Sequence, residues 1–387
     1  MSLHNIWKSV CRAAVALGLA ATTVSAVDPA SLVYVGTYTG AKSKGIYAYR
    51  MDLAKGTFED LGLVAETPNP SFLALDPKGH FLYAANELEK YGGAAAGSVT
   101  SFAIDSATGK LKQLNQESSR GTDPCHLIVD PSGHHVLVAN YGSGSLASLP
   151  VRPDGSLGPA FGFVQNEGKG TDPARQTGPH AHCLTMDPSN LYVLGCDLGL
   201  DKVLIWHFDS VKGTLVPNQP AFAAVKPGSG PRHMAFGHNG RFLYVLNEMT
   251  ATVSAFHYDP LKGALKELET VAALPAGHQG SFSGAEIAVH PNGRFLYASI
   301  RGANTIAIFE IQPMRGTLSL AGHMPTGGRT PRNFAIDPTG HFLLAANQDT
   351  DTIVEYAIHQ DNGTLTPAGH ILRVPSPVCV TFLPLHP

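Results

Sequence analysis

One phrase repeats along this chain. It has the form Asp-Pro-x-Gly-x-Phe-Leu-Tyr-Ala-Ala-Asn and returns about every 50 residues. The six copies are Asp76–Asn86, Asp130–Asn140, a shortened Asp187–Cys196, Gly237–Asn247, His290–Ile300 and Asp337–Asn347. Leu32–Thr37 matches only the second half of the phrase, and Ser376–Pro384 matches only the segment that comes before it. The two ends of the chain therefore complete each other.

Each repeat contains four short runs of β-branched and aromatic residues, separated by Gly, Pro, Asn and Asp, which predicts consecutive antiparallel strands. In one repeat we expect strands at Cys125–Val129, Val136–Ala139 and Ser145–Val151, and a fourth that opens at Gly155–Leu157. The sequence thus predicts an all-β seven-bladed β-propeller with four antiparallel strands per blade.

The complementary ends predict how the propeller closes. Ser376–Pro384 should pair with Leu32–Thr37, so that a C-terminal strand completes the N-terminal blade and no sheet edge is left open. A linear array or two packed sandwiches are the alternatives, but neither explains why the ends complement each other.

The N-terminal residues have the pattern of an export signal. Lys8 and Arg12 precede the apolar run Ala13–Val24, and small residues up to Ala26 offer a cleavage site. We expect residues 1–26 to be a signal peptide and 27–387 to form a single domain, periplasmic or secreted and without a membrane span, since the apolar run is too short for one. An uncleaved anchor is the alternative.

The remaining chain has a net charge of −5, because only two of the 27 Lys and Arg and none of the 30 Asp and Glu lie in the signal. This charge argues against nucleic acid as a partner.

Cys183 and Cys196 stand at nearly equal distances from the turn at Pro188–Asn190, so they should face each other across two strands. A disulfide between them is one hypothesis, and two buried small side chains is the other.

Antiparallel pairing brings the starts of first strands and the ends of second strands to one end of the propeller, near the axis. The charged and imidazole side chains expected there are Glu87, His126, His180, His182, Asp197, Arg232, His233, Glu248, Glu286, Arg301 and Arg332, together with Tyr141, Asn333 and Asn347. Arginines bind anionic groups and stabilise charge that develops on a carbonyl oxygen, while His or Glu accepts protons. These groups suit ester or lactone chemistry. The alternative is a purely structural role, in which these side chains bond to one another and hold neighbouring blades together.

The spacing of His180 and His182 points two imidazoles to one face of a strand, where they could bind a metal, although nearby arginines would repel a cation. The chain has no Gly-x-Ser-x-Gly motif, so a serine nucleophile has little support.

Four segments together carry a family resemblance: GPHAH at Gly178–His182, GPRH at Gly230–His233, LNE at Leu246–Glu248 and SIRGANTIAIF at Ser299–Phe309. With the repeat, they resemble the lactonase family of seven-bladed propellers, which includes bacterial 6-phosphogluconolactonase and a fungal carboxymuconate cyclase. The resemblance covers residues 27–387. It implies a site that works without a metal or organic cofactor.

The resemblance also implies roles for residues. It places the catalytic groups at His182, Arg232, Glu248 and Arg301, with His180 as the alternative histidine, and leaves His126, His180, His233, Glu286, Arg332 and Asn347 as candidates for substrate binding. The two catalytic arginines would hold an anionic group and polarise the carbonyl, and His182 or Glu248 would activate water.

The expected function is therefore hydrolysis of a sugar lactone by a monomeric enzyme. Export favours an unphosphorylated gluconolactone, because the phosphorylated lactone is made in the cytosol. The alternatives are a cycloisomerase that acts on an unsaturated dicarboxylate, and a propeller that binds a sugar acid, peptide or partner protein without turnover.

Overall fold

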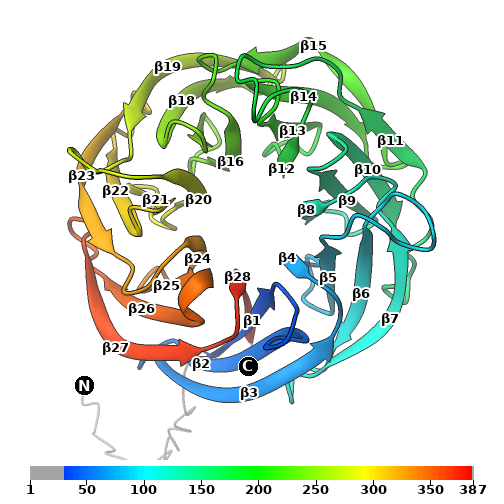
Figure 1. The fold of residues 1–387 in the computed structure, drawn as a ribbon, viewed down its shortest axis with the longest axis horizontal. Coiled ribbons are helices and arrows are strands. Elements are labelled where there is room, and N and C mark those ends of the chain that lie inside the picture. The colour runs from blue at the N-terminus through cyan, green and yellow to red at the C-terminus, as the bar shows by residue number, and fades with distance from the viewer. Residues whose placement is uncertain (1–29, 386–387) are drawn as a thin grey trace, which may run out of the picture.

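The computed structural model describes residues 30–385, which form seven four-stranded antiparallel sheets arranged radially around a central axis (Figure 1). This confirms the predicted β-propeller. The expected signal peptide and its cleavage site lie outside the described residues. Among the described residues, no helix has the length and apolar character of a membrane span.

The first strand of each blade lies nearest the axis. These strands are β28 (Pro377–Leu385), β4 (Pro70–Leu75), β8 (Pro124–Val129), β12 (Ala181–Met186), β16 (Pro231–Phe236), β20 (Ser283–Val289) and β24 (Pro331–Ile336). The second strands are β1 (Ala30–Thr37), β5 (Phe81–Asn86), β9 (His135–Asn140), β13 (Tyr192–Asp197), β17 (Phe242–Asn247), β21 (Phe295–Arg301) and β25 (Phe342–Asn347).

The third and fourth strands lie farther from the axis. The third strands are β2 (Gly45–Asp52), β6 (Ser98–Ile104), β10 (Ser145–Pro150), β14 (Lys202–Asp209), β18 (Thr252–Asp259), β22 (Thr305–Ile311) and β26 (Thr352–Ile358). The outer strands are β3 (Thr57–Glu66), β7 (Leu111–Ser118), β11 (Gly162–Gln165), β15 (Thr214–Ala224), β19 (Ala264–Ala272), β23 (Leu318–Pro325) and β27 (Leu365–Arg373). A 3₁₀-helix, η1 (Gln348–Thr350), follows β25.

The ends of the chain close the ring as predicted. β28 pairs antiparallel with β1, from Ala30 opposite Leu385 to Thr37 opposite Pro377. The first blade therefore takes its innermost strand from the C-terminal end and its other three from the N-terminal end. Strand pairing within one sheet therefore joins the two ends of the chain.

The fourth strand of the third blade differs from its prediction. The segment at Gly155–Leu157 forms only an isolated bridge, between Leu157 and Val151, and the strand itself is β11. The Asp154 carboxylate accepts bonds from the backbone and hydroxyl of Ser156, which holds this segment in a turn instead.

Seven clusters of buried apolar side chains form the core, and each joins two neighbouring blades. Tyrosines on second strands add hydrogen bonds across these interfaces. The hydroxyls of Tyr34, Tyr83 and Tyr297 donate to the carbonyls of Gly109, Gly155 and Gly363 in the next blade.

The repeated Asp-Pro-x-Gly phrase has a structural role in the turn between first and second strands. In one copy, the carboxylate of Asp130 accepts bonds from the backbone N–H groups of Ser132 and His135, at 3.2 and 2.6 Å. Gly133 adopts a φ of +75°, which a side chain would disfavour. These turns lie at the end of the propeller opposite the starts of the first strands.

The disulfide hypothesis is wrong. Cys183 and Cys196 do lie opposite each other in the register of β12 and β13, but both are free buried thiols. Burial raises the pKa of Cys183 to about 12, so it is un-ionised. The alternative hypothesis, two buried small side chains, is the one that the structure supports.

Candidate active site

A β-bulge near the start of the first strand is common to all seven blades. In six of them, the pairing with the second strand skips one residue, and these residues are Val378, Ser71, Cys125, His182, Arg232 and Arg332. A bulged residue is left out of the ladder and its side chain is turned away from the regular alternation. The bulge therefore places one side chain per blade at the same end of the propeller.

A second repeated position lies directly after the second strand. Tyr38, Glu87, Tyr141 and Glu248 follow Thr37, Asn86, Asn140 and Asn247. Arg301 occupies the same position, because Ile300 pairs with Thr305 as Asn247 pairs with Thr252. This position adjoins the bulge of its own blade.

The two repeated positions surround a cavity of about 200 Å³. Its lining residues are Tyr38, Glu87, Cys125, Tyr141, Arg175, His182, Glu248, Arg301 and Arg332. Pockets for drug-sized ligands span roughly 300–1,000 Å³, so this cavity suits a smaller molecule, about one sugar ring in size. Larger hollows of about 380 and 450 Å³ lie among the turns at the other end of the propeller and contain none of these residues.

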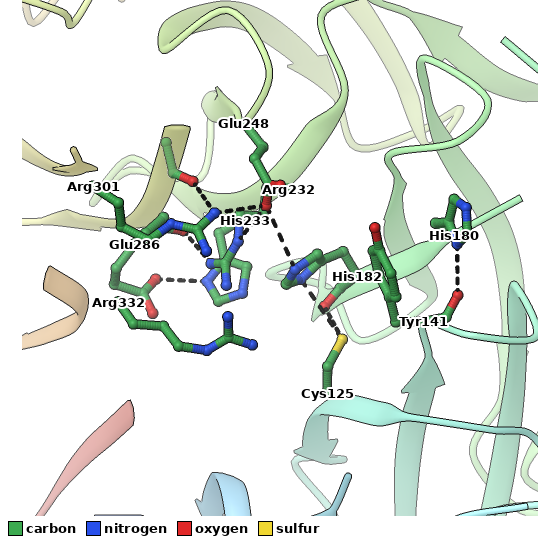
Figure 2. Close-up of polar contacts among 12 residues, drawn as sticks. Cys125, Tyr141, His180, His182, Arg232, His233, Glu248, Glu286, Arg301 and Arg332 are labelled. Carbon is green, nitrogen blue, oxygen red and sulfur yellow. Dashed lines mark hydrogen bonds and ion pairs between the residues drawn. The ribbon is translucent and has the colours of Figure 1, made fainter. Parts of the chain in front are cut away.

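Glu248 is bound by three arginines, two of which, Arg232 and Arg301, are shown in Figure 2. Its Oε1 lies 2.8 Å from Nη2 of Arg175, and its Oε2 lies 3.0 Å from Nε of Arg232 and 2.9 Å from Nη2 of Arg301. Burial alone would raise the pKa of Glu248, but these cations outweigh it and lower the pKa to about 2. Glu248 is therefore a permanent anion, and a poor proton acceptor at neutral pH.

His182 lies beside this cluster and is almost fully buried. Its Nε2 is 4.0 Å from Oε2 of Glu248, and its Nδ1 is 3.7 Å from Sγ of Cys125. Burial lowers the pKa of His182 well below 6.5, and the charge of Arg232 lowers it further. The imidazole is therefore neutral at pH 7 and free to accept a proton. Burial raises the pKa of the Cys125 thiol, so that group is not a nucleophile at this pH.

Arg301 has hydrogen-bonding capacity left over. Its Nη2 donates to the carbonyl of Gly284 at 3.0 Å in addition to its ion pair with Glu248, but among the described residues its buried Nε has no partner. Burial and the neighbouring Arg232 lower the pKa of Arg301 to about 10, which leaves it charged at pH 7. An unpaired buried donor is costly unless a ligand satisfies it.

Arg332 lines the cavity from the blade next to that of Arg301 (Figure 2). Its guanidinium lies over the ring of Tyr38 at 5.1 Å, and Nη2 is 3.7 Å from Oε2 of Glu87. Tyr38 donates to both carboxylate oxygens of Glu87 at 2.9 Å. Tyr38, Glu87 and Arg332 thus form a second polar group, which we call the distal trio.

Three of the expected substrate-binding residues form a buried layer and do not line the cavity. Nδ1 of His233 lies 2.8 Å from Oε1 of Glu286, and the ring of His126 packs edge-on against that of His233 at 5.3 Å. Asn333 donates to the other oxygen of Glu286 at 2.5 Å and accepts a bond from the backbone of Val380. These residues connect the innermost strands of different blades. For these three side chains, the structure therefore favours the structural role, which is to hold the blades together.

His180 and Asn347 also lie outside the cavity lining. His180 precedes the bulge, stacks on Tyr141 at 4.6 Å and has its Nδ1 3.0 Å from the Tyr141 carbonyl. Tyr141 separates it from His182 (Figure 2), so the two imidazoles do not share a face as predicted. Asn347 is fully buried and donates to the backbone of Thr326. Within residues 30–385, no group of three or more His, Cys, Asp or Glu has an arrangement that could hold a metal ion.

Comparison with known proteins gives the family. Residues 32–382 match the model for "Lactonase, 7-bladed beta-propeller". The chain belongs to this family. It is 36% identical over 351 residues to a 6-phosphogluconolactonase of Bacillus subtilis strain 168, covering 90% of this chain and 97% of that one. It is 37% identical over 306 residues to a 6-phosphogluconolactonase of Formosa agariphila, covering 78% and 85%.

A solved structure resembles this lactonase-family propeller closely. The periplasmic gluconolactonase of Pseudomonas aeruginosa superposes with a TM-score of 0.85 at 33% identity, covering 92% of this chain and 99% of that one. The resemblance predicted from the sequence motifs is therefore confirmed at the level of the family.

The cavity includes residues that were not chosen as site candidates from the sequence. Tyr38, Glu87 and Tyr141 occupy the same repeated position as Glu248. The rule already placed Glu87 and Tyr141 at this end of the propeller, and its extension to the first blade gives Tyr38. Arg175 gives no such signal, because it lies on the loop at 166–180 between β11 and β12, outside the repeated positions. The Asp172 carboxylate accepts a bond from the backbone N–H of Arg175 and helps to fix this loop.

Proposed function

We propose that this protein hydrolyses a sugar lactone. The observation that carries the proposal is the pairing of a neutral imidazole, His182, with the unpartnered buried donor of Arg301 in one small cavity. The first is a proton acceptor and the second is a donor for a developing oxyanion. The family and the relatives named as lactonases support the same reaction.

The residues suggest the following steps. His182 takes a proton from water as the water oxygen attacks the lactone carbonyl, and Arg301 donates to the carbonyl oxygen as it becomes negative. The bond between the carbonyl carbon and the ring oxygen then breaks. The ring oxygen takes the proton back from the imidazolium, and the acid product releases one proton to solvent.

Glu248 has a different role from the proton acceptor that the sequence suggested as one option. Its low pKa leaves it little tendency to take a proton from water. Its carboxylate instead fixes Arg175, Arg232 and Arg301, and lies 4.0 Å from His182, where it stabilises the imidazolium during the reaction.

We infer that the lactone is a gluconolactone outside the cytosol. The basic and apolar N-terminal pattern favours export. The structurally similar gluconolactonase of Pseudomonas aeruginosa is described as periplasmic, which supports the same location and substrate class.

The cycloisomerase alternative also has support from the charges. The cluster has four guanidinium groups but only two carboxylates, Glu87 and Glu248, and this excess of positive charge suits a dicarboxylate. That reaction consumes no water, which distinguishes it from hydrolysis.

Hydrolysis of glucono-δ-lactone, measured by proton release against the spontaneous rate, tests the proposal. We expect clear acceleration, a loss of about 10²–10³ in kcat for Arg301→Gln, and a loss of about 10²–10⁴ for His182→Asn. Arg315→Gln removes the same charge at an exposed turn and should behave like the wild type. If no gluconolactone is hydrolysed, the proposal fails.

A further inference from the structure

The two ends of the cavity differ in charge. At one end, Glu248 has three arginines around it. At the other end lies the distal trio, in which one carboxylate, Glu87, faces one guanidinium, Arg332. The excess positive charge therefore lies where the reaction generates an anion, and the distal end is close to neutral.

Glu87 is prepared to accept hydrogen bonds from a ligand. Its two oxygens share the single proton of the Tyr38 hydroxyl, and at 3.7 Å Arg332 interacts with it mainly through charge. A carboxylate has about four acceptor positions, so several remain available. Glu87 and Arg332 are only 20% and 15% exposed, but both line the cavity, so a ligand there reaches both.

These groups distinguish hydroxyls from phosphate. A sugar hydroxyl donates to Glu87 and accepts from Arg332, which satisfies both partners. Phosphate oxygens at neutral pH are strong acceptors that carry a charge of about −1.5 to −2, so they have little to donate to Glu87 and repel its carboxylate. Phosphate would also have to compete with Glu87 for Arg332.

We propose that Glu87 is a specificity-determining residue that selects lactones with hydroxyl groups, and against those with a phosphate, at the end of the molecule distant from the carbonyl. This inference rests on the proposed lactonase function. Tyr38 is a positioning residue in this arrangement, since it holds the Glu87 carboxylate in place.

The test compares kcat/KM for glucono-δ-lactone and its 6-phosphate in the wild type and in Glu87→Gln. We expect the wild type to prefer the unphosphorylated lactone, and the ratio of the two values to fall at least tenfold in Glu87→Gln. Glu89→Gln removes the same charge from an exposed position two residues away, outside the cavity lining, and should leave the ratio unchanged. Tyr38→Phe keeps the charge of Glu87, so it should lower turnover of the neutral lactone while changing the ratio much less.

Binding of the two products separates this inference from the proposed function. Calorimetry with gluconate and 6-phosphogluconate needs no turnover, and Glu87→Gln should raise the relative affinity for 6-phosphogluconate at least tenfold. If neither lactone is hydrolysed but this shift occurs, the lactonase proposal fails and the role of Glu87 stands. If the ratios of kcat/KM and of affinity stay unchanged in Glu87→Gln, the role of Glu87 is wrong even if the enzyme is a lactonase.

Discussion

Glu248 keeps a negative charge inside the protein because three guanidinium groups compensate it. Replacing it with Gln keeps the shape but leaves Arg232, which is only 2% exposed, without a counterion. Breaking a buried ion pair from one side costs about 3–5 kcal/mol. We therefore expect Glu248→Gln to lower the free energy of unfolding by about this amount in urea denaturation, and to lower lactonase activity as well.

The exposed variant Glu310→Gln is the control and should leave stability unchanged. If Glu248→Gln lost activity at full stability, Glu248 would be a proton acceptor and not an anchor for the arginines.

The pH dependence of the reaction tests the role of His182. Protonation removes the proton acceptor, so kcat/KM should fall as the pH drops through the pKa of His182 in the folded protein. Burial and Arg232 lower that pKa well below 6.5. We therefore expect kcat/KM to stay nearly constant from pH 7.5 to 6, measured at constant pH and corrected for spontaneous hydrolysis. A midpoint at 6.5 or above would contradict this assignment.

Motifs predicted which charged residues lie together but not what each of them does. Arg232, Glu248 and Arg301 stand in recognisable segments, and the structure brings them together. Whether Glu248 is a base or an anchor depends on how many cations surround it, and one of these, Arg175, comes from a loop outside the repeat. His126, His233 and Glu286 also have the right chemistry and strand position, but the side chains next to a bulge point into the layer below the cavity.

At the scale of single strands, the tyrosine contacts between blades offer a matched pair of substitutions. Tyr297→Phe removes a 2.7 Å bond to Gly363 and leaves that carbonyl without its partner, which costs about 1–3 kcal/mol. The hydroxyl of Tyr244 is buried without a partner among the described residues, so Tyr244→Phe should be neutral or stabilising. Thermal unfolding of both variants checks this. Equal losses would show that the bond to Gly363 contributes nothing.

Strand positions were predictable because each repeat confirms the others. The strand alternation rule failed at the bulges, however. It places His180 and His182 on the same face, whereas the pairing of Ala181 with Asp197 and Cys183 with Cys196 skips His182 and turns it into the cavity. A bulge requires no recognisable residue type, so it could not be predicted from the amino-acid pattern.

At the scale of the whole molecule, closure could be predicted because both halves of one blade are visible at the chain ends. The pairing of β28 with β1 matches that prediction. The cavity could not be predicted in the same detail, because its shape depends on side chains from all seven blades and one loop that meet only in the closed ring.

The bulge in every blade has a consequence for how such a site can change. Strand pairing resumes after each skipped residue, so the identity of that residue matters little to the ladder. Ser71 occupies this position in the second blade and Val378 lies at the bulge of the first, and neither lines the present cavity. New chemistry could therefore arise by single substitutions at these two positions, while the seven sheets and their closure stay as they are.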